Sequence, residues 1–148
     1  MIYPYRPYEV QPNPGQSEGI LYRPVIPLRV IGPANTQVIL GLVDTGSDVT
    51  VLPAFLLDLI GAAPSGETAH FRGVGGQVVT ARYSRVALAL DHRHGLYRWQ
   101  ATVGFLDGRD VAILGYAGFL EYFEAAFSSQ RRRLTLKPNQ RFAGDVQH

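Results

Sequence analysis

The chain has 148 residues, a hydrophobic content of 46%, 18% charged residues and no cysteine. This length fits one domain, and the composition favours a folded globular protein over a disordered one. The lack of cysteine excludes disulfides, thiolate zinc sites and cysteine nucleophiles. The net charge of +2 and the lack of a membrane-length apolar stretch favour a chain that binds neither nucleic acid nor membranes. Because the N-terminus lacks the apolar core of a signal peptide, we expect a cytoplasmic protein.

Residues 1–19 are rich in proline and tyrosine. Since proline fixes φ and has no backbone N–H, we expect these residues to form an extended arm. The arm either packs loosely as a tail or lies across a groove or a neighbouring subunit. A further hypothesis is that it occupies a binding cleft of its own domain and blocks that cleft. The folded domain is then expected over residues 20–138, with a C-terminal tail at 139–148.

Period-two alternation predicts a strand directly after the arm, with Ile26, Leu28 and Val30 on one face. After a turn at 32–35, the nearly unbroken apolar run 38–43 predicts a strand covered on both faces.

The segment 53–61 predicts a short helix, with Pro53 in its first turn and Gly61 at its end. Two strand segments are then expected on either side of the glycine-rich stretch 73–76. A turn at 91–95 follows the second of them.

Alternation resumes after this turn and places Tyr97, Trp99 and Phe105 in the core, where we favour a packing role over a cofactor platform. The sequence Asp-Gly-Arg at 107–109 predicts another hairpin. Aromatic and leucine residues at helical spacing predict an amphipathic helix at 117–127.

Leu134 and Leu136 are expected in the last strand. The basic run 131–133 is interpreted as a solvated loop entering this strand rather than as a nucleic-acid patch. A buried strand, a glycine turn and a short helix occur both at 38–61 and from 111 onwards, which predicts a two-fold pseudo-repeat.

Asp44, Thr45 and Gly46 stand between two apolar runs, so a carboxylate leaves a segment that otherwise suits the core. Such a carboxylate costs free energy unless it is hydrogen-bonded or solvated at a functional surface. Gly46 allows a tight turn that brings its N–H close to the carboxylate. The pattern fits a catalytic acid, and it also fits an Asx-turn in which Asp44 only stabilises its own loop.

The stretch VDTGSDVTVLP resembles the active-site loop of the single-domain, retropepsin-like aspartic proteases. AILGYAGFLEYF resembles their second signature, in which two apolar residues and a glycine precede a helix, and FRGVGG lies where the family has its flap. The three elements follow the family's order over residues 20–138, and the chain is more similar to cellular and bacterial relatives than to viral enzymes. The resemblance implies an all-β, closed, barrel-like acid-protease fold with one or two short helices and a flap hairpin.

The resemblance also implies an aspartic endopeptidase that hydrolyses protein or peptide substrates without a cofactor or metal. Two carboxylates share one proton around a water molecule in that mechanism. Because the chain has one such motif, the second carboxylate must come from a second copy, so we expect a homodimer with Asp44 of each subunit at the two-fold axis. The alternative is a non-catalytic or weakly active peptide-binding or dimerisation module with the same fold.

By resemblance, Thr45 grips the opposite loop, Gly46 and Asp48 contact the substrate backbone, and residues 73–76 form the moving flap. One of the last two flap glycines is expected at the tip, because glycine readily adopts a positive φ. The expected site residues are Asp44, Thr45, Gly46, Ser47, Asp48, Gly73, Val74, Gly75, Gly76, Ile113, Leu114 and Gly115.

Tyr116 departs from the viral pattern, in which an arginine after the second glycine braces the aspartate that corresponds to Asp48. Asp48 therefore needs another partner, such as an arginine of the second subunit. The dimer itself is then built in an unfamiliar way, with RLTLKP at 133–138 as a candidate interface strand.

Three other groups of residues are less suited to a functional site. His92 and His94 are interpreted as polar turn residues rather than metal ligands. Ser47 has no histidine in a recognisable triad relation. The glycines at 73–76 lack the lysine and the spacing of a phosphate-binding loop.

Overall fold

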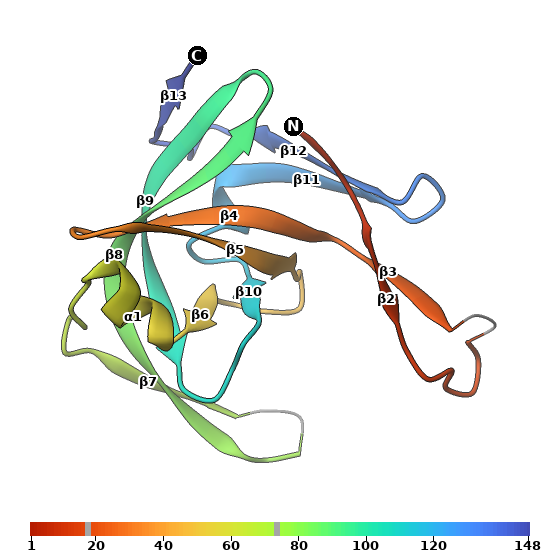
Figure 1. Cartoon of the computed structure of the whole chain (residues 1–148), viewed down its shortest axis with the longest axis horizontal. Helices are drawn as coiled ribbons and strands as arrows, with labels where there is room; N and C mark the ends of the chain where they lie inside the picture. Colours follow the sequence, from red (N-terminus) through yellow and green to blue (C-terminus); the bar gives the residue numbers. More distant parts are fainter. Residues whose placement is uncertain (17–18, 73–74) are drawn as a thin grey trace.

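The computed structural model describes residues 1–16, 19–72 and 75–148, and in these ranges the chain is predominantly β (Figure 1). The largest sheet of this described part has eight strands in the order β13, β9, β6, β10, β5, β4, β8 and β7. It is a mixed sheet, because β10 is parallel to β5 and β6 is parallel to β9 while the other neighbours are antiparallel. Its strands are β4 (Val25–Ile31), β5 (Thr36–Val43), β6 (Val51–Pro53), β7 (Thr68–Arg72), β8 (Val78–His92), β9 (Gly95–Leu106), β10 (Ala112–Leu114) and β13 (Asp145–Gln147).

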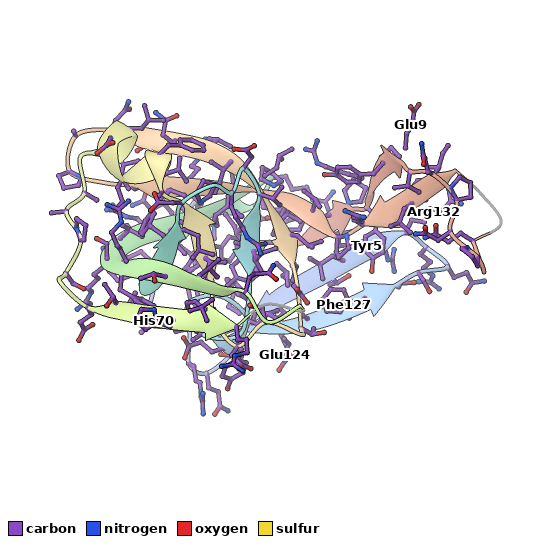
Figure 2. All side chains as sticks on the ribbon, turned by 90° about the horizontal axis from the view of Figure 1, so that it is seen from below. Tyr5, Glu9, His70, Glu124, Phe127 and Arg132 are labelled. Carbon is purple, nitrogen blue, oxygen red and sulfur yellow. The ribbon has the colours of Figure 1, made fainter. Side chains whose placement is uncertain are left out.

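Two smaller antiparallel sheets accompany it in the described ranges: a three-stranded sheet in the order β1, β12, β11, and the two-stranded β2–β3 ribbon. The ribbon and the β11–β12 hairpin project from the same side of the molecule (Figures 1 and 2). The Tyr5 N–H donates to the Arg132 carbonyl at 2.7 Å, and the Arg132 guanidinium lies 3.7 Å from the centre of the Tyr22 ring, so the two projections are joined. The strands of these sheets are β1 (Ile2–Pro4), β2 (Arg6–Glu9), β3 (Ile20–Arg23), β11 (Phe123–Ser128) and β12 (Arg133–Pro138).

The predicted alternation is confirmed on the strands that cover the core. On β4, Ile26, Leu28 and Val30 are all completely buried. On β9, Trp99 and Phe105 are buried in the same cluster. Each large apolar side chain removed from water in this way contributes roughly 1.5–3 kcal/mol, so these strands form the rigid wall on which the site is built.

The prediction that β5 is covered on both faces is wrong. Val38 is 58% exposed and Leu40 is 43% exposed, whereas Ile39 packs against the core. Successive side chains of a strand point to opposite faces, so the outer face of β5 is open along most of its length. Only its end, where β10 pairs with residues 41–43, is buried more completely.

The predicted short helix is confirmed as α1 (Phe55–Ile60), which ends at Gly61 with a left-handed φ of 68°. Its buried side chains are Leu56, Leu57 and Ile60. Pro53 does not lie in its first turn, contrary to expectation, because β6 continues to this residue and pairs there with the end of β9.

The predicted helix at 117–127 is wrong. The 3₁₀ turn η1 (Leu120–Tyr122) is followed directly by β11, which pairs with β12. A spacing of four residues also fits a strand, since alternate residues share a face, and Phe123 and Phe127 lie on the same face of β11. The hairpin with β12 therefore determines the structure of this segment.

The turn at 107–109 does not join a hairpin either. β9 pairs with β8, β6 and β13, whereas β10 lies between β5 and β6. Gly41 makes room there, because a Cβ at this position would lie 2.7 Å from the Leu114 side chain. The pseudo-repeat therefore holds only in part: β5 and β10 are parallel neighbours, but a 3₁₀ turn stands where the second helix was expected.

The N-terminal arm is extended, but a loosely packed tail is wrong for residues 2–9. β1 pairs with β12, and β2 pairs with β3. Tyr3 is only 7% exposed and belongs to the core.

The C-terminal end also differs from expectation. β12 is not the last strand, because β13 pairs with β9. The basic run 131–133 lies in the turn that enters β12, as interpreted. Within the described residues, no helix has the length and apolarity needed to cross a membrane.

Candidate active site

Asp44 directly follows the C-terminal end of β5, an inner strand of the large sheet. β5 and β10 pair in parallel with Val43 opposite Leu114, and the Asp44 N–H donates to the Leu114 carbonyl at 3.1 Å. The backbone of Asp44 is therefore fixed by the second signature, to which Ile113 and Leu114 belong. The two motifs that the sequence placed about 70 residues apart are brought together.

Gly115 allows the two loops to touch. A Cβ at this position would lie 2.2 Å from the Val49 carbonyl oxygen and 2.7 Å from that of Ser47, so no larger residue fits without movement. Immediately after it, the Tyr116 N–H donates to the Ser47 carbonyl at 2.9 Å, and the Ala117 N–H donates to the Asp48 carbonyl at the same distance. These contacts fix the loop 44–49 against the segment 115–117, while other atoms of the loop line a cleft.

The Asp44 carboxylate accepts a hydrogen bond from the Gly46 N–H through Oδ1 at 2.8 Å. This contact was expected from the tight turn, and it is compatible both with an Asx-turn and with a catalytic carboxylate. No described residue donates to Oδ2 of Asp44. One oxygen is thus oriented by the loop, and the other is available to a water molecule or a substrate.

The neighbours of Asp44 have different environments. Thr45 and Asp48 are exposed, and no positively charged side chain of the described residues forms an ion pair with Asp48. Ser47 turns inward, and its hydroxyl donates to the Val49 carbonyl at 2.8 Å. Tyr116 is 53% exposed and accepts a hydrogen bond from Arg141 at 3.2 Å.

The expected glycine-tipped hairpin is present, because β7 and β8 pair antiparallel from Thr68 opposite Arg82 to Arg72 opposite Val78. Gly75 has a φ of 114° and Gly76 a φ of 82°, so both adopt the conformation that was predicted for the tip. Gly73 and Val74 lie outside the described residues.

A cleft of about 320 Å³ opens between the Asp44 loop and this hairpin. None of the described arm residues lines it, so the arm of the same chain does not fill it. Arg72 and Arg109 also border the cleft. Sequence reasoning missed them, and the signal that could have found them is their position next to the glycine stretch and the second signature. The lining residues are Asp44, Gly46, Ser47, Val49, Val51, Phe71, Arg72, Val79, Leu106, Arg109 and Ile113.

No family model matches the chain, and no curated protein matches it. Its function is therefore inferred from the geometry of the cleft together with the motifs that resemble the retropepsin-like proteases.

Proposed function

We propose that the chain is a retropepsin-like aspartic endopeptidase that acts as a homodimer. The position of Asp44 carries this proposal: the carboxylate stands in a cleft beneath a glycine-tipped hairpin, while its loop is fixed by hydrogen bonds to the second signature. A purely structural carboxylate needs neither an open cleft nor a hairpin above it.

In the proposed mechanism the two Asp44 carboxylates of a dimer hold one water molecule and share one proton. The ionised carboxylate removes a proton from the water, whose oxygen attacks the carbonyl carbon of the peptide bond. The protonated carboxylate donates its proton to the carbonyl oxygen. The tetrahedral intermediate then collapses: the carboxyl group that took the proton of the water donates it to the leaving nitrogen as the C–N bond breaks, and the other carboxylate takes a proton from a hydroxyl of the intermediate, which regenerates the shared proton. The Gly46 N–H orients Oδ1 throughout.

A second copy is required because, among the described residues, Asp44 is the one carboxylate that lines the cleft. On the exposed side of the loop 44–49, Thr45 and Asp48 have no side-chain partner in the described part of the chain. Two loops that meet across a two-fold axis supply the second carboxylate and partners for both exposed side chains.

The β2–β3 ribbon supports the same assembly. The Val43 N–H donates to the Pro24 carbonyl at 2.9 Å, so the base of the ribbon lies beside Asp44. The ribbon belongs to neither apolar cluster of the described residues, and Ile20 on it is 46% exposed. A two-stranded ribbon is at best marginally stable by itself in water. The contact of Tyr22 with Arg132 supports it on one side, and a second copy near the Asp44 loop would cover more of it.

Strand β11 offers a further contact at the same side of the molecule (Figure 2). It is an edge strand of its sheet, contains no proline and carries one charged residue, Glu124. Such an edge is not protected against pairing with another chain. We include β11 in the proposed dimer interface, whereas β12, which pairs with β1 on one side and β11 on the other, has no free edge to offer.

The strand pairings support the barrel-like fold that the family resemblance implies. In addition to the linear strand order, β8 pairs with β9 over twelve residue pairs from Ala81–Leu106 to His92–Gly95. This pairing links β9, β6, β10, β5, β4 and β8 into a ring, as a closed sheet requires.

Cleavage of a denatured protein by the wild type and by Asp44→Asn from pH 4 to 7 tests the activity. We expect Asp44→Asn to lower the rate by about 10²–10⁴-fold, the usual contribution of a general acid or base. Asp145→Asn, which changes an exposed carboxylate on β13, is the matched control and should cleave like the wild type. Equal cleavage by Asp44→Asn and the wild type would refute the proposed activity.

A second candidate function is favoured by the hydrogen bond between Gly46 and Asp44, since it gives Asp44 a structural use. In that case the chain is a binding module that holds peptides without hydrolysing them. Measuring both peptide binding and cleavage distinguishes the two functions. If the chain is a binding module, the wild type should bind peptides and cleave none at any pH tested.

A further inference from the structure

Two arginines border the cleft that contains Asp44, and they come from different loops. Arg72 is the last residue of β7 and pairs with Val78 at the end of the hairpin that adjoins its turn, and Arg109 lies in the connection between β9 and β10. Both side chains are exposed. Figure 1 shows β7 and the β9–β10 connection in the lower part of the view, and Arg72 and Arg109 both line one cavity.

Neither guanidinium is neutralised by a carboxylate of the described residues, because their ion pairs involve other groups. The loop of Arg109 also contains Asp107, which is bound by Arg82 on β8 at 3.3 Å, and Asp110, which forms no ion pair with a described residue. Asp44 stands in the same cleft but forms no ion pair with either arginine. The rim of the cleft is therefore positively charged.

The wall between these arginines is apolar. Val51 is 8% exposed and Leu106 is 5% exposed, and together with Ala81 they form the small buried cluster under the cleft. Phe71 and Val79 pack against this cluster from the hairpin. A ligand in the cleft therefore meets an aliphatic and aromatic surface bordered by two guanidinium groups.

We propose that the cleft selects peptide segments in which apolar side chains flank an aspartate or glutamate close to the bond to be cleaved. This inference rests on the proposed function, in which a peptide lies in the cleft beside Asp44. Guanidinium groups bind carboxylates through paired, charge-assisted hydrogen bonds. The apolar neighbours of the acid bury themselves against the wall beneath the hairpin.

Arg72 is expected to contribute more than Arg109. Arg109 also borders a second cavity, whose lining includes Asp58, Asp107 and Asp110, so carboxylates there are expected to weaken its attraction for an acidic ligand. Arg72 borders only the cleft among the cavities described for the chain. Replacing each arginine separately distinguishes their contributions.

Binding of three fluorescein-labelled peptides tests the selection without any turnover. The peptides share one sequence of alanine, valine and leucine and differ at one central residue, which is glutamate, glutamine or lysine. We expect Asp44→Asn to bind the glutamate peptide about fivefold more tightly than the glutamine peptide, the size of a partly exposed ion pair. The lysine peptide should bind most weakly, and added salt should reduce the difference in affinity between the glutamate and glutamine peptides.

Adding Arg72→Gln to Asp44→Asn should remove most of this preference, and adding Arg109→Gln should remove less. Arg85→Gln, which changes an exposed arginine of β8 outside the cleft, is the matched control and should leave the preference intact. Equal binding of the three peptides, no binding of any, or an unchanged preference in both arginine variants would overturn the inference.

A cleavage experiment separates this inference from the proposed activity. A mixed peptide library is incubated with the wild type, and the cleaved bonds are identified by mass spectrometry. Cleavage without enrichment of aspartate or glutamate near the cut bond contradicts the selection and leaves the protease intact. A preference in binding without any cleavage supports the selection and contradicts the protease.

Discussion

Substitution of Gly115 by alanine tests whether the segment 113–117 holds the Asp44 loop in place. The new Cβ would lie 2.2 Å from the Val49 carbonyl oxygen and 2.7 Å from that of Ser47, and both neighbours are backbone atoms that cannot rotate away. The two loops must therefore separate. Overpacking of this kind costs about 1–3 kcal/mol.

Separation also weakens the hydrogen bonds on either side of Gly115. The Asp44 N–H donates to Leu114 at 3.1 Å, and the Tyr116 N–H donates to Ser47 at 2.9 Å. Each such bond contributes about 0.5–1.5 kcal/mol. We expect a total loss of about 3 kcal/mol, which lowers the Tm by about 6–12 °C in a chain of this size.

Thermal unfolding followed by tryptophan fluorescence measures this loss. The chain has one tryptophan, Trp99, which is 3% exposed in the core and changes its environment on unfolding. Gly19→Ala is the control, because its Cβ would make only an ordinary contact of 3.4 Å with the Val10 carbonyl. A Gly115→Ala protein that unfolds within 1–2 °C of the control, roughly the shift from half a kcal/mol, would refute this account of the loop.

Three further outcomes are expected. Burial and neighbouring positive groups lower the pKa of His92, so the folded state favours its neutral form. Its contribution to stability is therefore present above about pH 6.5 and lost as the pH falls. We expect the Tm of the wild type to fall towards pH 5 and that of His92→Asn to fall less, which unfolding scans at several pH values measure. Arg132→Ala removes the contact with Tyr22 and should cost up to about 1 kcal/mol while weakening the dimer in sedimentation. Because the chain has no cysteine, oxidised Thr45→Cys should form a linked dimer on a non-reducing gel, whereas Asp145→Cys should not.

The sequence was sufficient to predict strands and their buried faces where burial follows a local period. Ile26, Leu28 and Val30 alternate with less buried residues on β4, and the buried side chains of β9 follow the same rule, because one face of each strand lies on the core. The short helix was found from its pattern and its terminal glycine. The glycines with positive φ in the β7–β8 connection were likewise predictable from their residue type.

Local pattern failed where distant segments decide the structure. Phe123 and Phe127 fit a helix and a strand equally well, and only pairing with β12 distinguishes the two. Tyr3 is buried because β1 meets a strand more than 130 residues away. Arg72 and Arg109 border the same cleft through the hairpin and the β9–β10 connection, and no periodicity connects them.

Mixing wild-type protein with Asp44→Asn measures most directly whether the active site is shared between two chains. The proteins are combined at constant total concentration, allowed to exchange subunits, and assayed on a denatured protein. If each site needs both Asp44 residues, an equal mixture should retain about one quarter of the wild-type activity, because random pairing leaves that share of intact dimers. A retained activity of about one half, proportional to the wild-type fraction, would contradict the account.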